Sequence, residues 1–323
     1  MFVLGLQGSP RRKGNTHYLL TSFLKEAEKL GARTAIIEVD KKHIVPCKEY
    51  VVCEKKGFCP IDDDMKTEIY PLLRQADVVV AATPVFFYNT TAQLKALIDR
   101  TQTLWARKYR LNLTDPNRKW RKGFVLAMGA TRGKNLFEGL HLTAKYFFDA
   151  VGASYDGSLT YWQIEKPGDM AALSGVEQDV QTAVTNLISP LLSRKIIVFV
   201  DQTGSCAAPM AWAWTQFLAG DRVEAQYAAV QPVDQFEPAM MTAMHEKGID
   251  MEFRGPVGLN VSEFTRGPDQ VIVLGETVSG VPSQWNALVE TWNIPIADEI
   301  DSRQMELLRD NIEAKVKDLI HRL

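Results

Sequence analysis

The sequence has no long hydrophobic run. No apolar stretch approaches the ~20 residues that a bilayer-spanning helix requires, and the first strand-like pattern begins at Met1, so we expect no signal peptide. Neither sign of charge dominates, because 37 basic and 39 acidic residues give a net charge of −2. This balance offers no general attraction to nucleic acid or to an anionic membrane surface. We therefore expect a cytoplasmic protein with neither nucleic acid nor a membrane among its partners.

The length of 323 residues suggests two domains of ordinary size. Pro190 and the following Ser193–Lys195 mark a boundary, which predicts one domain over residues 1–192 and a second over 193–323. Residues 107–121 combine several basic side chains with aromatic ones. We expect this segment to be a solvated loop between a helix and a strand rather than a nucleic-acid-binding patch.

Buried strand patterns alternate with helical periodicity along the first 190 residues. Five short apolar runs predict strands at residues 2–6, 34–39, 78–82, 124–128 and 158–162. Strands that alternate with helices indicate an α/β fold with a doubly wound parallel sheet. Ligands bind beyond the carboxyl ends of the strands in such sheets, and there we expect the loops 8–16, 83–91 and 128–133.

The loop Gly8–Thr16 leads from the first strand into an amphipathic segment at residues 18–30, an arrangement that can hold a phosphate. Glycines permit tight turning, a helix N-terminus offers free N–H groups, and the loop contains Arg11, Arg12 and Lys13. The spacing matches neither G-x-G-x-x-G nor G-x-x-x-x-G-K-[ST], so a monophosphate such as that of FMN fits better. The structural alternative is a basic solvated turn with Asn15 or Thr16 as the helix N-cap.

Residues 1 to about 190 resemble the flavodoxin-like NAD(P)H-dependent FMN reductase and iron-sulfur flavoprotein family. The resemblance rests on Gly8–Arg11 with Gly14–Thr16, on Thr83–Phe87 and on Ala92–Arg100. It implies a flavodoxin-like fold, FMN as cofactor, NAD(P)H as substrate, and a homodimer or homotetramer with flavins near the subunit interface. It implies that the phosphate lies on Ser9, Arg11, Gly14, Asn15 and Thr16, and the isoalloxazine against Pro84, Val85, Phe86, Phe87, Tyr88 and Gly129. We expect at least one of the three aromatic residues only to pack in the core or in a dimer.

Three cysteines follow the second predicted strand. In iron-sulfur members of the family, C-x2-C-x2-C-x(4-7)-C ligates a [4Fe-4S] cluster, and here Cys47, Cys53 and Cys59 match three positions while Tyr50 stands at the second. Because a phenol replaces one thiolate, we expect no [4Fe-4S] cluster and no metal site, only reduced thiols. Two alternatives stay open: a cluster held by three cysteines, with or without an outside ligand, and a zinc site completed by His43.

Residues 193–323 resemble the low-molecular-weight protein tyrosine phosphatases and the related arsenate reductases, which implies a second, three-layer α/β domain. The match covers 196–211, 223–226, 236–250 and 269–274. The C-x5-R signature of that family falls on Asp201 and Ala207, and its general acid on Ile296, with Asp298 two residues late. Without the nucleophilic thiolate and the anion-binding guanidinium, we expect a catalytically inactive domain.

Two side-chain groups in this second half have open interpretations. Cys206 remains in the loop, where we expect a small buried thiol rather than a nucleophile. Trp212 and Trp214 on the following helix suggest a contact surface or, equally, core packing.

The favoured function is an FMN-dependent oxidoreductase that takes hydride from NAD(P)H and passes electrons to a small acceptor such as a quinone, a flavin or a metal species. Hydride transfer requires no acid or base from the protein, so we name no catalytic residue. The alternative is a non-catalytic FMN-binding electron carrier whose second half recruits a partner.

Overall fold

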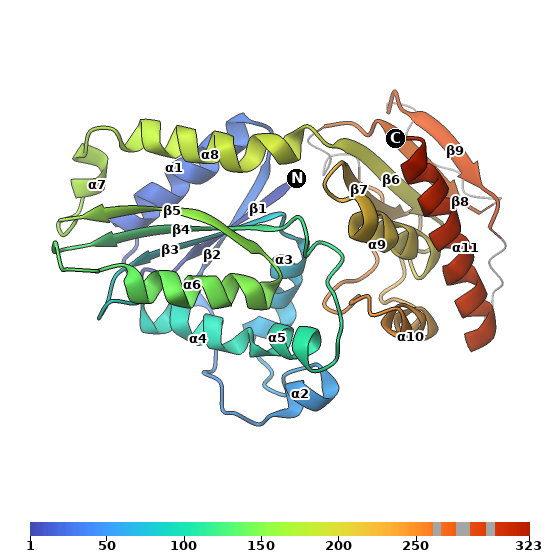
Figure 1. Cartoon of the computed structure of the whole chain (residues 1–323), viewed down its shortest axis with the longest axis horizontal. Helices are drawn as coiled ribbons and strands as arrows, with labels where there is room; N and C mark the ends of the chain where they lie inside the picture. The colour runs from blue at the N-terminus through green and yellow to red at the C-terminus, as the bar shows by residue number, and fades with distance from the viewer. Residues whose placement is uncertain (261–265, 276–284, 295–300) are drawn as a thin grey trace. The chain divides into compact units, whose positions relative to one another are not determined.

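The structure is a computed structural model that describes residues 1–260, 266–275, 285–294 and 301–323 (Figure 1). The chain divides into two compact units. The first contains residues 1–112 and 120–192, and the second contains residues 113–119 and 193–323. No helix in the described part of the chain is both long and apolar enough to cross a membrane.

The first unit is built on a five-stranded sheet whose neighbouring strands all pair in parallel. The strand order is β2-β1-β3-β4-β5, with β1 at Phe2–Gln7, β2 at Arg33–Glu38, β3 at Val78–Pro84, β4 at Lys122–Gly129 and β5 at Ser154–Trp162. All five strands predicted from the sequence are confirmed, with ends that differ by a few residues. This order is that of a flavodoxin-like doubly wound fold.

Helices cover both faces of this sheet. Figure 1 shows α1 (Asn15–Lys29) and α8 (Val176–Leu192) over one face, and α4 (Ala92–Arg100), α5 (Gln102–Tyr109) and α6 (Glu138–Val151) over the other. The shorter helices are η1 (Val39–Lys41), α2 (Val52–Lys56), η2 (Met65–Ile69), α3 (Tyr70–Gln75) and α7 (Asp169–Ala172). Helix α8 continues through Pro190 to Leu192, so this proline lies inside the helix rather than beyond its end.

The core of the first unit follows from the sequence pattern. All six residues of β1 are buried, as a central parallel strand requires, and α1 buries Leu20, Phe23, Leu24 and Ala27 at helical spacing. These side chains pack with Val78, Val80 and Leu126 of the neighbouring strands and with apolar residues of α8. The carboxyl ends of β1, β3 and β4 are therefore anchored in a rigid core.

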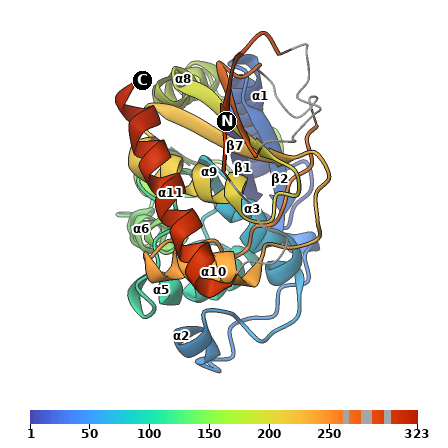
Figure 2. The same ribbon diagram turned by 90° about the vertical axis from the view of Figure 1, so that its right-hand side faces the viewer.

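The second unit is built on a four-stranded parallel sheet in the order β7-β6-β8-β9. Its strands are β6 (Lys195–Asp201), β7 (Val223–Ala229), β8 (Gln270–Leu274) and β9 (Leu288–Trp292). Helices α9 (Ala207–Ala219), α10 (Pro238–Glu246) and α11 (Ser302–His321) share one apolar core (Figure 2). Trp212 and Trp214 are buried in that core, so their role as a contact surface is excluded.

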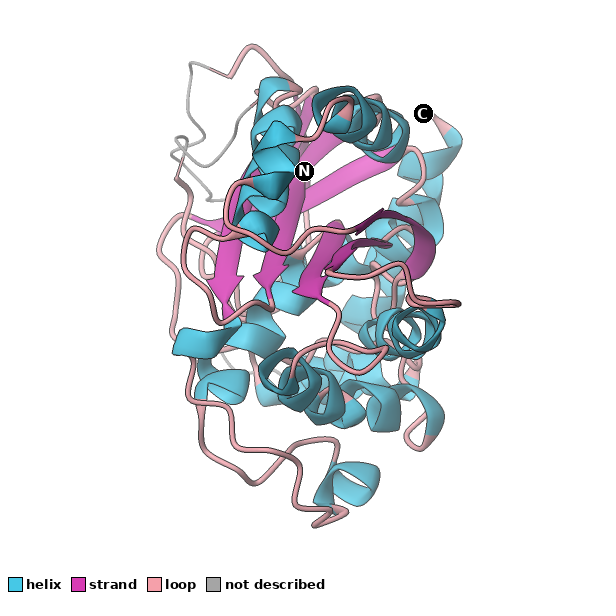
Figure 3. Cartoon of the chain, turned by 90° about the vertical axis from the view of Figure 1, so that its left-hand side faces the viewer, coloured by secondary structure: helices cyan, strands magenta, loops and turns pink. Residues whose placement is uncertain are grey.

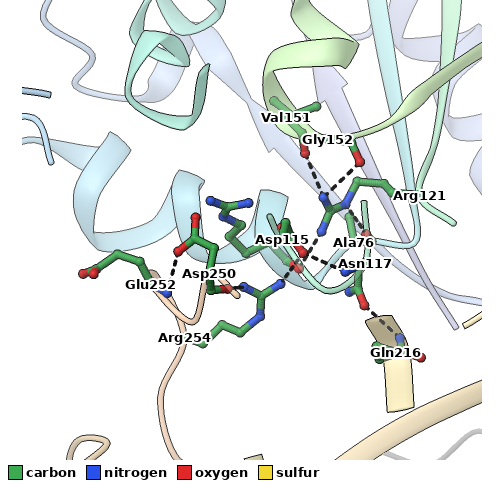
Figure 4. A network of polar contacts seen from close by, with 11 residues as sticks. Ala76, Asp115, Asn117, Arg121, Val151, Gly152, Gln216, Asp250, Glu252 and Arg254 are labelled. Carbon is green, nitrogen blue, oxygen red and sulfur yellow. Dashed lines mark hydrogen bonds and ion pairs between the residues drawn. The ribbon is translucent and has the colours of Figure 1, made fainter. Parts of the chain in front are cut away.

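Residues 113–119 belong to the second unit, although they lie between α5 and β4 in the sequence. Thr114 pairs with Ile249 as an isolated parallel bridge, and Asp115 forms a buried ion pair with Arg254 at 3.0 Å (Figure 4). Asn117 accepts a hydrogen bond from the side-chain amide of Gln216 at 2.8 Å. The prediction of a solvated loop is therefore wrong here, because these polar side chains have buried partners far away in the sequence.

Arg121, the second residue after the chain re-enters the first unit at Trp120, is also buried. Its guanidinium donates to the backbone carbonyls of Arg74, Ala76 and Val151 at 2.7 to 2.9 Å (Figure 4). A side chain that satisfies three carbonyls inside the unit is a structural cation and not part of a basic surface.

Candidate cofactor site

Three loops meet beyond the carboxyl ends of β1, β3 and β4. The backbone N–H of Gly8 donates to Ala82 O at 2.8 Å, and the Thr91 hydroxyl donates to Gly8 O at 2.5 Å. Val85 N–H donates to Met128 O at 2.8 Å, which ties the second loop to β4. The loops lie at the switch point, where β2 is on one side of β1 and β3 on the other, and sheets of this order bind ligands there.

Gly8 is required by the close approach of neighbouring chain segments. A Cβ at this position would lie 2.6 Å from Leu94 Cδ2 and 2.9 Å from the backbone oxygen of Ala82. Since the backbone oxygen is fixed by β3, no larger residue fits without moving the loop. The absence of a side chain therefore keeps the turn tight against β3 and α4.

The N-terminus of α1 is open to an anion. Gly14 precedes the helix, no side chain of the described residues caps it, and its first turn contains no acidic residue. The exposed Arg11, Arg12 and Lys13 precede it. Unpaired N–H groups, a positive dipole end and nearby cations together favour a phosphate. The alternative in which Asn15 or Thr16 caps the helix is wrong.

Three residues predicted to bind the phosphate have side chains that bond to different parts of the first unit: Ser9, Asn15 and Thr16. Ser9 is buried, and its hydroxyl accepts the Arg11 N–H at 3.2 Å. Asn15 turns toward the loop at 166–170, where its carbonyl oxygen accepts from Gly168 N and Met170 N and its amide donates to Lys166 O at 2.8 Å. Thr16 is buried with its hydroxyl 3.5 Å from the sulfur of Met128. The side chains of Asn15 and Thr16 are thus bonded within the first unit.

The second loop presents three aromatic side chains on a tight turn. Phe86 and Asn89 exchange two backbone hydrogen bonds of 2.8 and 3.0 Å, and the central residues Phe87 and Tyr88 have φ values of 49° and 62°. Left-handed backbone at bulky residues is costly and is concentrated at functional sites. Phe86 and Tyr88 are about half exposed and Phe87 is fully exposed, so none of the three packs in the described core.

The third loop approaches the second closely. A Cβ on Gly133 would lie 3.1 Å from the Tyr88 hydroxyl, and one on Gly129 would lie 2.4 Å from Leu136. Gly129 therefore could not carry a side chain without displacing Leu136. Its carbonyl accepts Ile164 N–H at 3.0 Å.

Sequence reasoning missed Trp162 at the end of β5. Its ring packs edge-on against Phe137 with centroids 5.1 Å apart, and about half of it stays exposed. Because β5 pairs with β4, the last residue of β5 lies beside the Gly129 turn. The signal was available, since Trp162 ends a predicted strand of the same sheet.

Cys47, Cys53 and Cys59 line one cavity of about 490 Å³ together with Tyr50. Burial raises the pKa of Cys53, and the neighbouring Cys59 and Cys47 raise it further. Among the described residues, no three His, Cys, Asp or Glu side chains converge on a point where one metal ion could sit, so the zinc site completed by His43 is not formed.

The β6–α9 loop of the second unit is closed around its own carboxylate. Asp201 is 2% exposed and accepts the N–H groups of Gly204 at 2.5 Å and Ala208 at 2.9 Å. Burial raises the pKa of Asp201. Burial also raises the pKa of the Cys206 thiol to about 11, and the charge of Asp201 adds to this shift. Cys206 is therefore a thiol at neutral pH. Ile296 and Asp298 lie outside the described residues.

The strand order and the uncapped β1–α1 turn define a class: a flavodoxin-like domain. Residues 1–162 match the sequence pattern of the NADPH-dependent FMN reductase family, and the chain belongs to this family.

Named relatives agree with that assignment. The chain is 34% identical over 185 residues to an iron-sulfur flavoprotein of Archaeoglobus fulgidus, a match that covers 55% of this chain and 87% of that protein. It is 36% identical over 132 residues to an iron-sulfur flavoprotein of Methanosarcina thermophila, covering 41% of this chain and 65% of that protein. The chain thus spans slightly less than two thirds of the length of the Methanosarcina relative.

A solved arsenate reductase from Archaeoglobus fulgidus is similar with a TM-score of 0.34 and 21% identity, covering 39% of this chain and 98% of that one.

Proposed function

We propose that this protein is an FMN-dependent oxidoreductase that takes hydride from NAD(P)H and passes electrons to a small acceptor such as a quinone, a flavin or a metal species. The observation that carries the proposal is the open N-terminus of α1 beside the Gly8 turn, at the switch point of a sheet of flavodoxin-like order. When bound, FMN supplies hydride acceptance and electron transfer, while the protein supplies binding and orientation.

The proposed site has two ends, one that binds the phosphate of FMN and one that contacts its ring system. The backbone N–H groups from Gly14 to Thr16 bind the phosphate, and Arg11 adds positive charge. Pro84 and the turn at 86–89, together with Gly129, form the surface for the flat ring system. The hydroxyls of Thr83 and Thr90, 2.9 Å apart, brace the loop from inside.

Purification of the full chain tests this proposal. We expect a bound yellow flavin that is released as FMN, and bleaching of its absorption by NADH or NADPH under anaerobic conditions. Protein that binds no added FMN would refute the proposal. Flavin that resists both pyridine nucleotides would favour the electron-carrier alternative.

We also propose that the second unit has no phosphatase or arsenate reductase activity. Asp201 already accepts the N–H groups that would otherwise receive a substrate oxyanion, and Ala207 offers no counter-charge. Turnover of p-nitrophenyl phosphate or thiol-dependent reduction of arsenate by the purified chain would contradict this.

We propose that the protein is cytoplasmic and that, of the homodimer and the homotetramer which the family resemblance implies, it forms the homodimer. Apolar side chains are exposed on the turn at 86–89 and on α6, which packs against that turn: Phe87, Leu142 and Tyr146. Burying them against a second copy would remove apolar area from water at the flavin site. Light scattering after size-exclusion chromatography should give twice the chain mass of 36.2 kDa.

A further inference from the structure

Gln7 is a buried polar residue at the carboxyl end of β1. It is 3% exposed, and its side-chain oxygen Oε1 is buried without a hydrogen-bond partner among the described residues. The other five residues of β1 carry no polar side chain. Buried polar atoms nearly always have a partner, and one without a partner lowers the stability of the fold. The Gln7 amide therefore calls for a partner from outside the chain.

The side chain of Gln7 faces helix α1. Side chains alternate between the two faces of a strand, so Val3, Gly5 and Gln7 share one face of β1. Val3 belongs to the same apolar core as Leu20 of α1, and a Cβ on Gly5 would lie 3.0 Å from Leu20 Cδ1. Figure 3 shows the strands of the first unit between two layers of helices, and α1 and α8 form one of these layers. The amide of Gln7 is thus enclosed between β1 and α1.

The part of α1 opposite Gln7 is its first turn. Helix α1 returns alongside β1, and one turn before Leu20 it carries Thr16. Two residues of a strand and four residues of a helix both span about 6–7 Å, so Gln7 lies opposite Thr16. The Thr16 hydroxyl is 3.5 Å from the sulfur of Met128, and the Asn15 side chain bonds to a separate loop. The polar side chains of this turn therefore do not serve Gln7.

Gln7 also lies between the two ends of the proposed FMN site. The N-terminus of α1 is on one side of it, and its neighbour on β3 is Ala82, two residues before Pro84. The ends of β1 and β3 are tied together by the hydrogen bond from Gly8 N–H to Ala82 O at 2.8 Å. A ligand that joins a phosphate at α1 to a ring system at Pro84 has to cross these two strand ends.

The chemistry of the ribityl chain of FMN suits this amide. An amide both accepts and donates hydrogen bonds, and each ribityl hydroxyl can do the same. A phosphate monoester at pH 8 has no proton to give to Oε1, because its second pKa is about 6. Since Oε1 is closed to solvent, the amide has to turn toward a ligand. The last side-chain torsion of glutamine is broad, so this turn costs little.

We propose that Gln7 is a specificity-determining residue of the flavin site, whose amide exchanges a hydrogen bond with a ribityl hydroxyl of FMN. This rests on the proposed function, because it requires a flavin at this edge of the sheet. The flavin-free protein is destabilised by a buried amide without a partner, and flavin binding removes that destabilisation. Gln7 thus lowers the stability of the empty protein and raises its affinity for a ligand whose chain carries hydroxyl groups.

The variant Gln7→Met tests the proposal, because methionine is an unbranched side chain of similar length that lacks the amide. We expect the melting temperature of the flavin-free variant to rise by about 2–4 °C, since the unpaired polar group is gone. Its affinity for FMN, from fluorescence titration at pH 8, should fall about two- to tenfold. A flavin analogue with a plain pentyl phosphate in place of the ribityl phosphate should bind to wild type and variant equally well.

Gln226→Met is the matched control. The side-chain amide of Gln226, on strand β7 of the second unit, donates to Glu224 Oε1 at 3.0 Å. Its replacement removes a hydrogen bond instead of an unpaired group, so the melting temperature should not rise. The affinity for FMN should stay that of the wild type.

Three results would overturn the proposal. One is an unchanged affinity of Gln7→Met for FMN, and another is an equal loss of affinity for FMN and for the pentyl analogue. The third is a lower melting temperature of the flavin-free variant, which would show that Gln7 has a structural role. If the wild type bound FMN and any of these results followed, only this proposal would fail. If the wild type bound no FMN, the proposed function would fail with it.

Discussion

The two units contain the same strand-loop-helix turn in two opposite states. The first turn joins β1 to α1 and the second joins β6 to α9, and each begins at a strand with parallel neighbours on both sides. In the first, the helix N-terminus is uncapped by any described side chain and is preceded by cations. In the second, Asp201 occupies the N–H groups of Gly204 and Ala208.

The difference shows that the shape of such a turn does not decide whether it binds an anion. Both turns present N–H groups at a helix N-terminus, which suffices for attraction. The two turns differ in the side chain present where the strand passes into the turn. Gly8 adds no side chain after β1, whereas Asp201 brings a carboxylate into the second turn.

The largest expected effect comes from closing the first turn. Gly8→Val places a Cβ 2.6 Å from Leu94 and 2.9 Å from Ala82 O, so the loop must shift. We expect FMN affinity to fall roughly ten- to hundredfold, because overpacking costs about 1–3 kcal/mol. Fluorescence titration with FMN measures this. Gly255→Ala in the second unit is the control, since nothing lies within 4 Å of a Cβ at that position, and it should leave the affinity unchanged. If Gly8→Val bound FMN as tightly as the wild type, Gly8 would not be part of the FMN site.

Opening the second turn is the converse experiment. Asp201→Ala leaves the N–H groups of Gly204 and Ala208 without their acceptor, so we expect a loss of about 1–3 kcal/mol in the free energy of unfolding. With saturating FMN present to fill the proposed phosphate site of the first turn, inorganic phosphate at millimolar concentration should raise the melting temperature of the variant and not that of the wild type. Thermal denaturation with and without phosphate measures both. Stabilisation of the wild type by phosphate would show that Asp201 does not fill the turn.

A smaller effect is expected from the exposed cations of the first turn. Arg11→Ala should weaken FMN binding by about 0.3–1 kcal/mol, which is up to about fivefold, because surface charge is screened by water. The difference in FMN affinity between the variant and the wild type should become smaller as salt is raised. The reason is that salt already screens the attraction between Arg11 and the FMN phosphate in the wild type. FMN titration at low and high ionic strength checks this, and a salt-independent loss would indicate a packing role.

The smallest effect concerns the pH dependence of the second turn. Burial raises the pKa of Asp201 above its value in the unfolded chain, so its contribution to stability is present at low pH and is lost as pH rises through the folded pKa. We expect the stability of Asp201→Asn relative to wild type to increase with pH above about 4, where the unfolded-state carboxyl titrates. Urea denaturation across this range measures it. If the stability of Asp201→Asn relative to wild type decreased with pH, the hydrogen bonds from the N–H groups would lower the pKa of Asp201 by more than burial raises it.

Much of the first unit could be predicted from the sequence because its signals are local. The apolar run at Phe2–Leu6 and the glycine after it define β1 and the turn, whatever surrounds them. For the second unit, the prediction of an inactive loop rested on a resemblance to the phosphatase family, with Asp201 and Ala207 at its signature positions, and it stays a prediction.

In other places a partner far away in the sequence decided the outcome. The side chain of Asn15 bonds to residues 166–170, about 150 positions away, so no local pattern indicates its direction. The sequence of residues 113–119 predicts a solvated basic loop. In the structure, Asp115 instead forms an ion pair with Arg254, and Asn117 accepts a hydrogen bond from Gln216. Trp212 and Trp214 could be assigned to the core only once the helix had packed.

The sequence by itself determined the alternation of strands and helices, the glycine-rich first turn and the set of three cysteines with Tyr50 among them. These are properties of neighbouring residues, set by backbone freedom, hydrophobic period and side-chain chemistry. Only the tertiary structure decided that no described side chain caps the helix α1, that Asp201 accepts the N–H groups of its own turn, and that Cys47, Cys53 and Cys59 line one cavity. Each of these depends on hydrogen bonds or burial that exist only after separate parts of the chain have packed together.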